Sequence, residues 1–190
     1  MKPIFVFSIF SILLQVIPIS NLPAKEKLWD AFKSGNHIIL IRHAFAPGFS
    51  DPENFNVKDC TTQRNLNNTG RNQARRIGDL FRMQGIQYTK IYSSQWCRCL
   101  ETAKLLKLGN VKILKSLNSF FEYFERKEKQ TTATRKWIRN TSLDTPTVLV
   151  THLVNITALT NNSISSGELV FVKRTSKGKL VSIGSIETIQ

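Results

Sequence analysis

Basic side chains that could handle phosphate stand where apolar segments of the chain end. Arg42 and His43 directly follow an apolar, β-branched run, and His152 directly follows a second one. Arg98 lies in a helix-like segment just after a third strand pattern. Ligands of open α/β sheets bind beyond the carboxyl ends of the strands. We therefore expect these four side chains to meet at one edge of a sheet.

The chemistry that this set favours is phosphoryl transfer. A neutral imidazole is a nucleophile near pH 7 and can accept a phosphoryl group on nitrogen. Guanidinium groups match the geometry of phosphate oxygens, and preorganised cations stabilise the charge of the transition state. Any one histidine alone is more often an ordinary residue, so the hypothesis depends on the convergence. His37, at the opposite end of its strand, is predicted to be a surface residue.

The elements that must position these residues alternate along the chain. Alternating strands and helices predict an α/β fold, a three-layer α/β/α sandwich with a mostly parallel central sheet. A helix is expected to begin at an N-cap, Thr69, and another to break near Gln130. Strands are predicted at 37–42, 89–93, 111–114, 147–151, 168–174 and 180–183, and helices at 25–34, 69–83, 95–107, 120–140 and 152–159.

Length, composition and net charge indicate how many domains the protein has and what kind of partner it can bind. The 190 residues suit one domain, and 41% apolar residues can form a core. A net charge of +14 favours anionic partners such as nucleic acid, anionic lipid or phosphorylated ligands. The basic helical segments lack the interleaved aromatic residues of a nucleic-acid platform, so no nucleic-acid partner is expected. Peripheral contact with an anionic envelope surface stays open.

The first 24 residues resemble a secretory signal peptide. Lys2 precedes an apolar run that is too short for a transmembrane helix, and Ser20 or Ala24 offers a small residue before a cleavage point. An uncleaved anchor or a buried helix is the alternative. The expected domain is therefore 25–190, in an exported protein that is periplasmic or secreted and has no transmembrane segment after processing.

The chain has three cysteines, which in an oxidising compartment could form one disulfide. Cys60 could pair with either Cys97 or Cys99, leaving one thiol over. The cysteines lack the CxxC spacing typical of zinc sites, so no metal site is predicted.

Four motifs in order resemble the histidine phosphatase (phosphoglycerate-mutase-like) superfamily, and the chain is similar to a small exported bacterial subgroup of it. Arg42-His43 matches the opening Arg-His-Gly, with alanine in the glycine position. The segment 66–78 matches the second motif, which has a leucine, a glycine four residues later, the pair Gln-Ala and then another glycine. The segment 93–103 matches the third motif, Ser-x-x-x-Arg-x-x-x-Thr-Ala. His152 falls at the second essential histidine, so the resemblance spans 38 to about 160.

This resemblance implies a two-step, metal-free hydrolysis of phosphate monoesters without a cofactor. His43 would be the nucleophile that becomes phosphohistidine, and Arg42, Arg98 and His152 would bind the phosphoryl oxygens. A carboxylic acid would protonate the leaving oxygen and then activate water. The expected substrate is a phosphorylated small molecule or sugar, for example a phosphate on an envelope sugar.

The acid is where the chain departs from the resembled pattern. The mutase-like branch has Leu-x-Glu after the third strand, but Ser119 occupies that position here. The general acid is predicted to be Glu122. The alternatives are Glu125 and three acids of the long loop at 44–66: Asp51, Glu53 and Asp59.

Two further polar residues have open roles. Asn155, three residues after His152, is predicted to bind the substrate or the imidazole, with helix capping as the alternative. Arg64 either reaches the pocket from the loop or makes a structural pair. The predicted function is that of an exported phosphatase acting through His43. The alternative is a catalytically weak relative that binds a phosphate ligand but lacks the usual acid.

Overall fold

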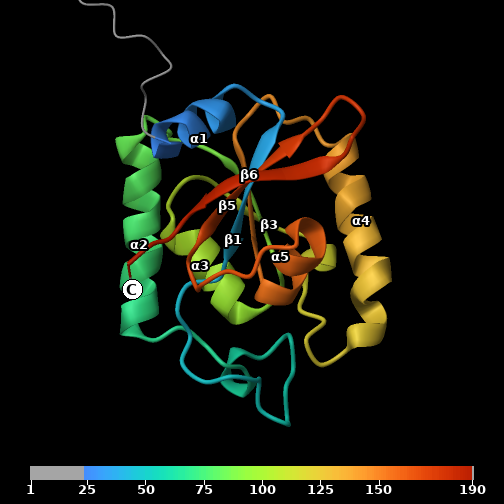
Figure 1. The fold of residues 1–190 in the computed structure, drawn as a ribbon. Helices are drawn as coiled ribbons and strands as arrows, with labels where there is room; N and C mark the ends of the chain where they lie inside the picture. Colours follow the sequence, from blue (N-terminus) through green and yellow to red (C-terminus); the bar gives the residue numbers. More distant parts are fainter. Residues whose placement is uncertain (1–23, 190) are drawn as a thin grey trace, which may run out of the picture.

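The computed structural model describes residues 24–189, which form one six-stranded sheet with helices on both faces (Figure 1). The predicted signal peptide at 1–24 therefore lies outside the described residues except for Ala24, which begins α1. The helices are α1 (Ala24–Lys33), α2 (Asn68–Met83), α3 (Cys97–Leu105), α4 (Lys127–Asn140) and α5 (Leu153–Thr160), with short 3-10 turns at Cys60–Thr62, Lys115–Leu117 and Phe124–Arg126. The strands are β1 (His37–Arg42), β2 (Lys90–Ser93), β3 (Val111–Ile113), β4 (Thr147–Thr151), β5 (Leu169–Arg174) and β6 (Leu180–Ile186).

The strand order in the sheet is β3-β2-β4-β1-β5-β6. The first four strands in this order are parallel to one another. At the other edge of the sheet, β5 is antiparallel to β1, and β6 is antiparallel to β5. The central strands β1 and β4 pair in parallel, with Arg42 opposite Thr151. The carboxyl ends of these two strands are thus side by side, as the sequence pattern requires.

Alternation along the buried strands creates the two cores of the sandwich. In β1, Ile39 and Ile41 face a core shared with α1, α2 and α3, whereas Ile38 and Leu40 face a second core shared with α4 and α5. Burial on both faces explains why these strands are continuously apolar rather than alternating. The predicted three-layer α/β/α sandwich with a mostly parallel sheet is confirmed.

Three local predictions are wrong. Asn67, not Thr69, caps α2, because its Oδ1 accepts a hydrogen bond from the Gly70 amide. The predicted helix 120–140 begins as α4 only at Lys127 and runs through Gln130 without the expected break; residues 121–126 are all exposed and give a helix no apolar face to bury. His37 is buried, and its Nδ1 lies 2.6 Å from the carbonyl oxygen of Gly35.

Two glycines of α2 allow close packing of the backbone. A Cβ at Gly70 would lie 1.9 Å from the Phe45 carbonyl oxygen, just after β1, and a Cβ at Gly78 would lie 2.2 Å from the carbonyl oxygen of Leu106. The glycines of the 66–78 motif therefore set the distance from α2 to the segment after His43 and to the end of α3. None of the described helices is long and apolar enough to span a bilayer.

We expect Gly78→Ala to destabilise the fold by about 1–3 kcal/mol, because the added methyl group must push α2 away from Leu106. Alanine is the better helix former by about 1 kcal/mol, so local propensity acts in the opposite direction. Urea unfolding of this variant, beside Arg75→Ala on the exposed face of α2, measures the effect. Stability equal to or above that of wild type would contradict the packing account.

Candidate active site

The two histidines at the strand ends meet as predicted. His43 and His152 each follow the last residue of their strand, and the His43 amide donates to the Thr151 carbonyl at 2.9 Å. Their ring centroids are 5.5 Å apart, and both side chains are almost fully buried. Backbone pairing of β1 with β4 thus places the two imidazoles together.

The backbone that follows His43 is held by side chains from two helices. The Ala44 amide donates to Thr102 Oγ1 of α3 at 3.0 Å, and the Phe45 amide donates to Gln73 Oε1 of α2 at 2.8 Å. Gln73 and Thr102 belong to the two middle motifs of the sequence, so those motifs fix the chain direction just after the histidine.

A carbonyl oxygen sets the tautomer of His43. Its Nδ1 lies 2.8 Å from the Ala44 carbonyl oxygen. Because a carbonyl oxygen only accepts hydrogen bonds, Nδ1 must carry the proton in the neutral ring. The lone pair is then on Nε2, which is the nitrogen available for attack on an electrophile.

His152 is held by polar and aromatic neighbours. Its Nε2 lies 2.9 Å from Ser94 Oγ and 3.4 Å from Cys99 Sγ, and its ring meets Trp96 edge-on at 5.3 Å. Burial raises the pKa of the Cys99 thiol to about 12, so this side chain is a neutral thiol. The ring of His152 is therefore oriented by the end of β2 and the start of α3.

Burial and positive charge lower the pKa of both imidazoles well below the ordinary value of 6.5. Loss of hydration is the largest cause, and the positive charge of Arg98 is the next. Both rings are thus neutral at pH 7, which is the state a nitrogen nucleophile requires.

Three arginines surround the histidines. Arg42 comes from β1, Arg98 from α3 and Arg64 from the long loop. Burial and the neighbouring Arg98 lower the pKa of Arg64 to about 10 and also lower that of Arg42, but both stay charged at neutral pH. All three have a buried Nε atom without a hydrogen-bond partner. Buried donors are normally satisfied, so these orphaned groups are suited to an oxyanion.

These groups line a cavity of about 150 Å³ beyond the carboxyl ends of the central strands. Its inner part is basic, and its outer part carries aromatic side chains from the long loop and from the segment before α4. The lining residues are Arg42, His43, Gly48, Phe49, Ser50, Asp51, Phe55, Arg64, Trp96, Arg98, Ser119, Phe121, Glu122, Tyr123, His152, Leu153 and Val154.

The comparison with known sequences decides the family. A model of the histidine phosphatase superfamily (branch 1) matches residues 38–148, more than half of the chain. The chain belongs to the histidine phosphatase superfamily. The match ends before His152, which the fold brings beside His43. Membership supports phosphatase activity.

One curated relative and several solved structures resemble this histidine phosphatase. The mitochondrial serine/threonine-protein phosphatase Pgam5 of Drosophila virilis is 36% identical over 93 residues, which is 46% of this chain and 29% of that protein. The match thus spans less than a third of the relative's length.

Two solved structures show the same fold at low sequence identity. Phosphoserine phosphatase from Entamoeba histolytica, in complex with 3-phosphoglyceric acid, has a TM-score of 0.57 and 15% identity, covering 80% of this chain and 97% of that chain. Mycobacterial glucosyl-3-phosphoglycerate phosphatase with VO3 has a TM-score of 0.54 and 14% identity, covering 73% and 92%.

The carboxylates proposed as general acid fall into two groups in this histidine phosphatase. Glu122 and Asp51 line the cavity. Glu125 is exposed, and its Oε1 lies 3.6 Å from Nε of Arg126. Asp59 accepts hydrogen bonds from the amide and the hydroxyl of Thr61 at the start of a 3-10 turn. Neither carboxylate lines the cavity. The loop acid Glu53 is exposed and is also not among the lining residues.

Asn155 is not among the residues that line the cavity, so its contact with substrate or imidazole stays a prediction. Its Nδ2 donates to the carbonyl oxygen of Asn118 at 3.0 Å, and its side chain is buried. One turn into α5, the amide therefore ties that helix to the segment preceding Ser119. The amide does not cap the helix, whose N-cap residue is His152, and its Oδ1 is buried without a partner.

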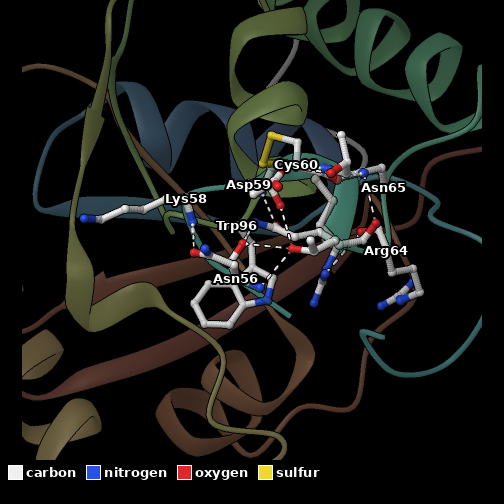
Figure 2. The surroundings of a disulfide bond; sticks show 12 residues. Asn56, Lys58, Asp59, Cys60, Arg64, Asn65 and Trp96 are labelled. Carbon is white, nitrogen blue, oxygen red and sulfur yellow. Dashed lines mark hydrogen bonds between the residues drawn. A yellow bond between two sulfur atoms is a disulfide. The ribbon is translucent and has the colours of Figure 1, made fainter. Parts of the chain in front are cut away.

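The disulfide joins the long loop to α3. Cys60 pairs with Cys97, which immediately precedes Arg98, and Cys99 is the free thiol (Figure 2). The bond closes a chain segment with a sequence separation of 37, which stabilises a fold by about 4 kcal/mol in the loop-entropy account. The loop that carries Asp51 and Arg64 is thus fixed beside the cavity. In the described part of the chain, no cluster of three or more His, Cys, Asp or Glu side chains could hold a metal.

We predict that both site histidines stay neutral at pH 6 in phosphate-free buffer. Their folded pKa lies below the unfolded value near 6.5, so the unfolded chain binds protons first as pH falls. Their contribution therefore makes the protein less stable as pH drops below about 6.5. Imidazole NMR titration, assigned with His43→Ala and His152→Ala, measures this. A midpoint near 6.5 for either ring would contradict it.

Proposed function

We propose that this phosphatase hydrolyses phosphate monoesters through a phosphohistidine at His43. The observation that carries the proposal is a neutral imidazole, with its lone pair on Nε2, in a cavity lined by three arginines whose buried Nε groups have no partner. Such a site combines a nucleophile with preorganised donors for the phosphoryl oxygens.

In the first step, Nε2 of His43 attacks phosphorus while the bond from phosphorus to the ester oxygen breaks. The protonated carboxyl of Glu122 gives its proton to the departing oxygen, so an alcohol leaves. The three arginines stabilise the charge on the transferred group. His152, buried against Ser94 and Trp96, takes a proton from the bound monoester monoanion, donates a hydrogen bond to a phosphoryl oxygen, and returns the proton to inorganic phosphate when that product leaves.

In the second step, water attacks the phosphorus of phosphohistidine. The Glu122 carboxylate takes a proton from that water, and the bond from phosphorus to Nε2 breaks. Inorganic phosphate leaves, and both His43 and the protonated Glu122 are restored. The sum is ester plus water giving alcohol plus phosphate, without a metal ion or cofactor.

The aromatic mouth of the cavity supports a ring-bearing substrate. Phe49 is 81% exposed and contacts Phe121 edge-on at 5.2 Å, and Tyr123 also lines this region. Aromatic faces pack well against rings whose polar groups stay in water. The proposed substrate is therefore a phosphorylated sugar of the cell envelope, whose leaving oxygen would take its proton from Glu122.

Two features support export to an oxidising compartment. The N-terminal 24 residues have the pattern of a signal peptide, and the Cys60–Cys97 disulfide is of a kind that persists outside the reducing cytosol. Export would bring the enzyme to phosphorylated groups of the envelope, with peripheral contact between its basic surface and anionic lipids.

A second candidate function is phosphate-ligand binding without efficient turnover. Ser119 lines the cavity at the position where the mutase-like branch carries its acid, and Glu122 is exposed to solvent. Binding of phosphate or vanadate with no release of phosphate from an activated ester would favour this candidate over the enzyme.

We expect His43→Ala to lower the hydrolysis of p-nitrophenyl phosphate by about 1,000-fold or more, because the nucleophile is lost. EDTA should leave the wild-type rate unchanged. Lys136→Ala, on the exposed side of α4, is the matched surface control. Comparable activity in His43→Ala, or loss of wild-type activity in EDTA, would overturn this mechanism.

Glu122→Gln should slow hydrolysis of an alkyl phosphate by about 100-fold or more and that of p-nitrophenyl phosphate far less. A poor leaving group needs the proton, whereas nitrophenolate departs without it. The kcat/KM values on both esters measure the difference, because they report the first step and not the later attack of water, which Glu122 assists for either ester. Glu125→Gln is the control outside the cavity. Equal effects on the two esters would remove Glu122 from the role of acid.

A further inference from the structure

One carboxylate of the cavity is already fully occupied by hydrogen bonds. Asp51 Oδ1 accepts from Arg98 Nη1 at 2.6 Å and from the Arg64 amide at 3.0 Å. Its Oδ2 accepts from Arg98 Nη2 at 3.1 Å and from Trp96 Nε1 at 2.9 Å. The side chains of Asp51 and Arg98 are 9% and 5% exposed. The pair is therefore a buried, bidentate contact in which each carboxylate oxygen has two donors.

This arrangement makes Asp51 unsuitable as the general acid. Burial alone would raise the pKa of its carboxyl, but the hydrogen bonds and charge of Arg98, with the Trp96 and Arg64 donors, outweigh burial and hold the pKa below its ordinary value. A proton on either oxygen would displace one of these donors. Asp51 therefore stays ionised through any catalytic cycle at neutral pH.

The same contact determines which part of Arg98 remains free. Both Nη atoms are engaged by Asp51, and Nη1 also lies 3.2 Å from the Arg64 carbonyl oxygen. The Nε atom is buried and has no partner. Arg98, which lines the cavity, is thus held at the end of its guanidinium, and its Nε is the donor left without a partner.

We infer that Asp51 is a positioning residue, which holds the Arg98 guanidinium by its end so that the Nε edge donates to the phosphoryl group. The inference rests on the proposed phosphoryl site but adds a residue to it. A long arginine side chain has many rotamers, and fixing it before the ligand arrives removes an entropic cost from binding.

Asp51 is itself anchored independently of Arg98. The Trp96 indole that binds it stacks on Phe55 at 5.0 Å and meets His152 edge-on. Its loop is joined to α3 by the Cys60–Cys97 disulfide and by the Cys97 amide, which donates to Gln63 Oε1 at 2.9 Å. Because Asp51 is held both by Trp96 and by its own loop, its carboxylate keeps a fixed position against Arg98, and phosphate does not have to displace it. We call this fixed contact between Asp51 and Arg98 the clamp.

The test compares Asp51→Asn with wild type and with Asp59→Asn, which makes the same change in the same loop outside the cavity. An amide nitrogen cannot accept a hydrogen bond, so Asp51→Asn sets a donor against the donors of Arg98 or Trp96. The Kd of vanadate is measured by calorimetry, kcat and KM on p-nitrophenyl phosphate by steady-state kinetics, and folding by thermal unfolding.

We expect Asp51→Asn to bind vanadate at least tenfold more weakly and to raise KM, with Asp59→Asn close to wild type. Asp51→Glu, which keeps the charge and both acceptors, should recover part of the affinity. Unchanged or tighter vanadate binding by folded Asp51→Asn would overturn the inference; tighter binding would mean that the carboxylate competes with the ligand for Arg98.

A second variant keeps the test decisive if Asp51→Asn does not fold. Trp96→Phe retains a ring beside His152 but removes the Nε1 donor to Asp51. We expect several-fold weaker vanadate binding in this variant, and affinity equal to wild type would contradict the clamp. Failure of the wild-type protein itself to bind vanadate would instead reject the proposed function, so the two failures are distinguishable.

Discussion

The parallel pairing of β1 with β4 is the constraint on which the rest of the site depends. Because Arg42 lies opposite Thr151, the next residues, His43 and His152, leave neighbouring strands at the same edge of the sheet. The pairing is secured by apolar side chains on both faces, so the two imidazoles are located by the most buried part of the molecule. A register shift of one residue would turn alternate side chains to the wrong face and separate the rings.

The long loop gives this rigid edge its binding chemistry. Residues 44–66 supply Arg64 and Asp51, and the disulfide at Cys97 fixes the loop one residue from Arg98. Three positive charges near two buried imidazoles would be costly without a counterion, and Asp51 provides one in the absence of ligand. The same positive charges help keep the imidazoles neutral. Nucleophile, cations and counterion are therefore parts of one electrostatic system.

The fold and the centre of the site could be predicted from the sequence because they depend on local patterns. Apolar runs define β1 and β4, and the rule for strand ends brings together Arg42, His43 and His152, as found in the structure. Helix limits are less predictable: α4 begins only at Lys127 because residues 121–126 bury little, and their exposure is a property of the folded chain.

The contacts of the long loop could not be predicted, because they join residues far apart in the chain. Asp51 and Arg98 are 47 positions apart, and no spacing rule relates a loop acid to a helical arginine. The one-turn distance from His152 to Asn155 predicts contact with substrate or imidazole, but it gives no sign of the hydrogen bond from Asn155 Nδ2 to the Asn118 carbonyl oxygen. One feature of the sequence points toward the contact between Asp51 and Arg98. The two side chains that bind Asp51, Trp96 and Arg98, flank Cys97, and Cys97 is a possible disulfide partner of Cys60 in the long loop.

Detection of the covalent intermediate tests the central claim most directly. Wild-type enzyme turning over p-nitrophenyl phosphate is quenched in alkali, where phosphohistidine survives, and its peptides are analysed by mass spectrometry. The account predicts a phosphoryl group on the His43 peptide that forms and decays fast enough to sustain steady-state turnover. Sustained turnover without a phosphoryl group on His43, or with one on another residue, would contradict it.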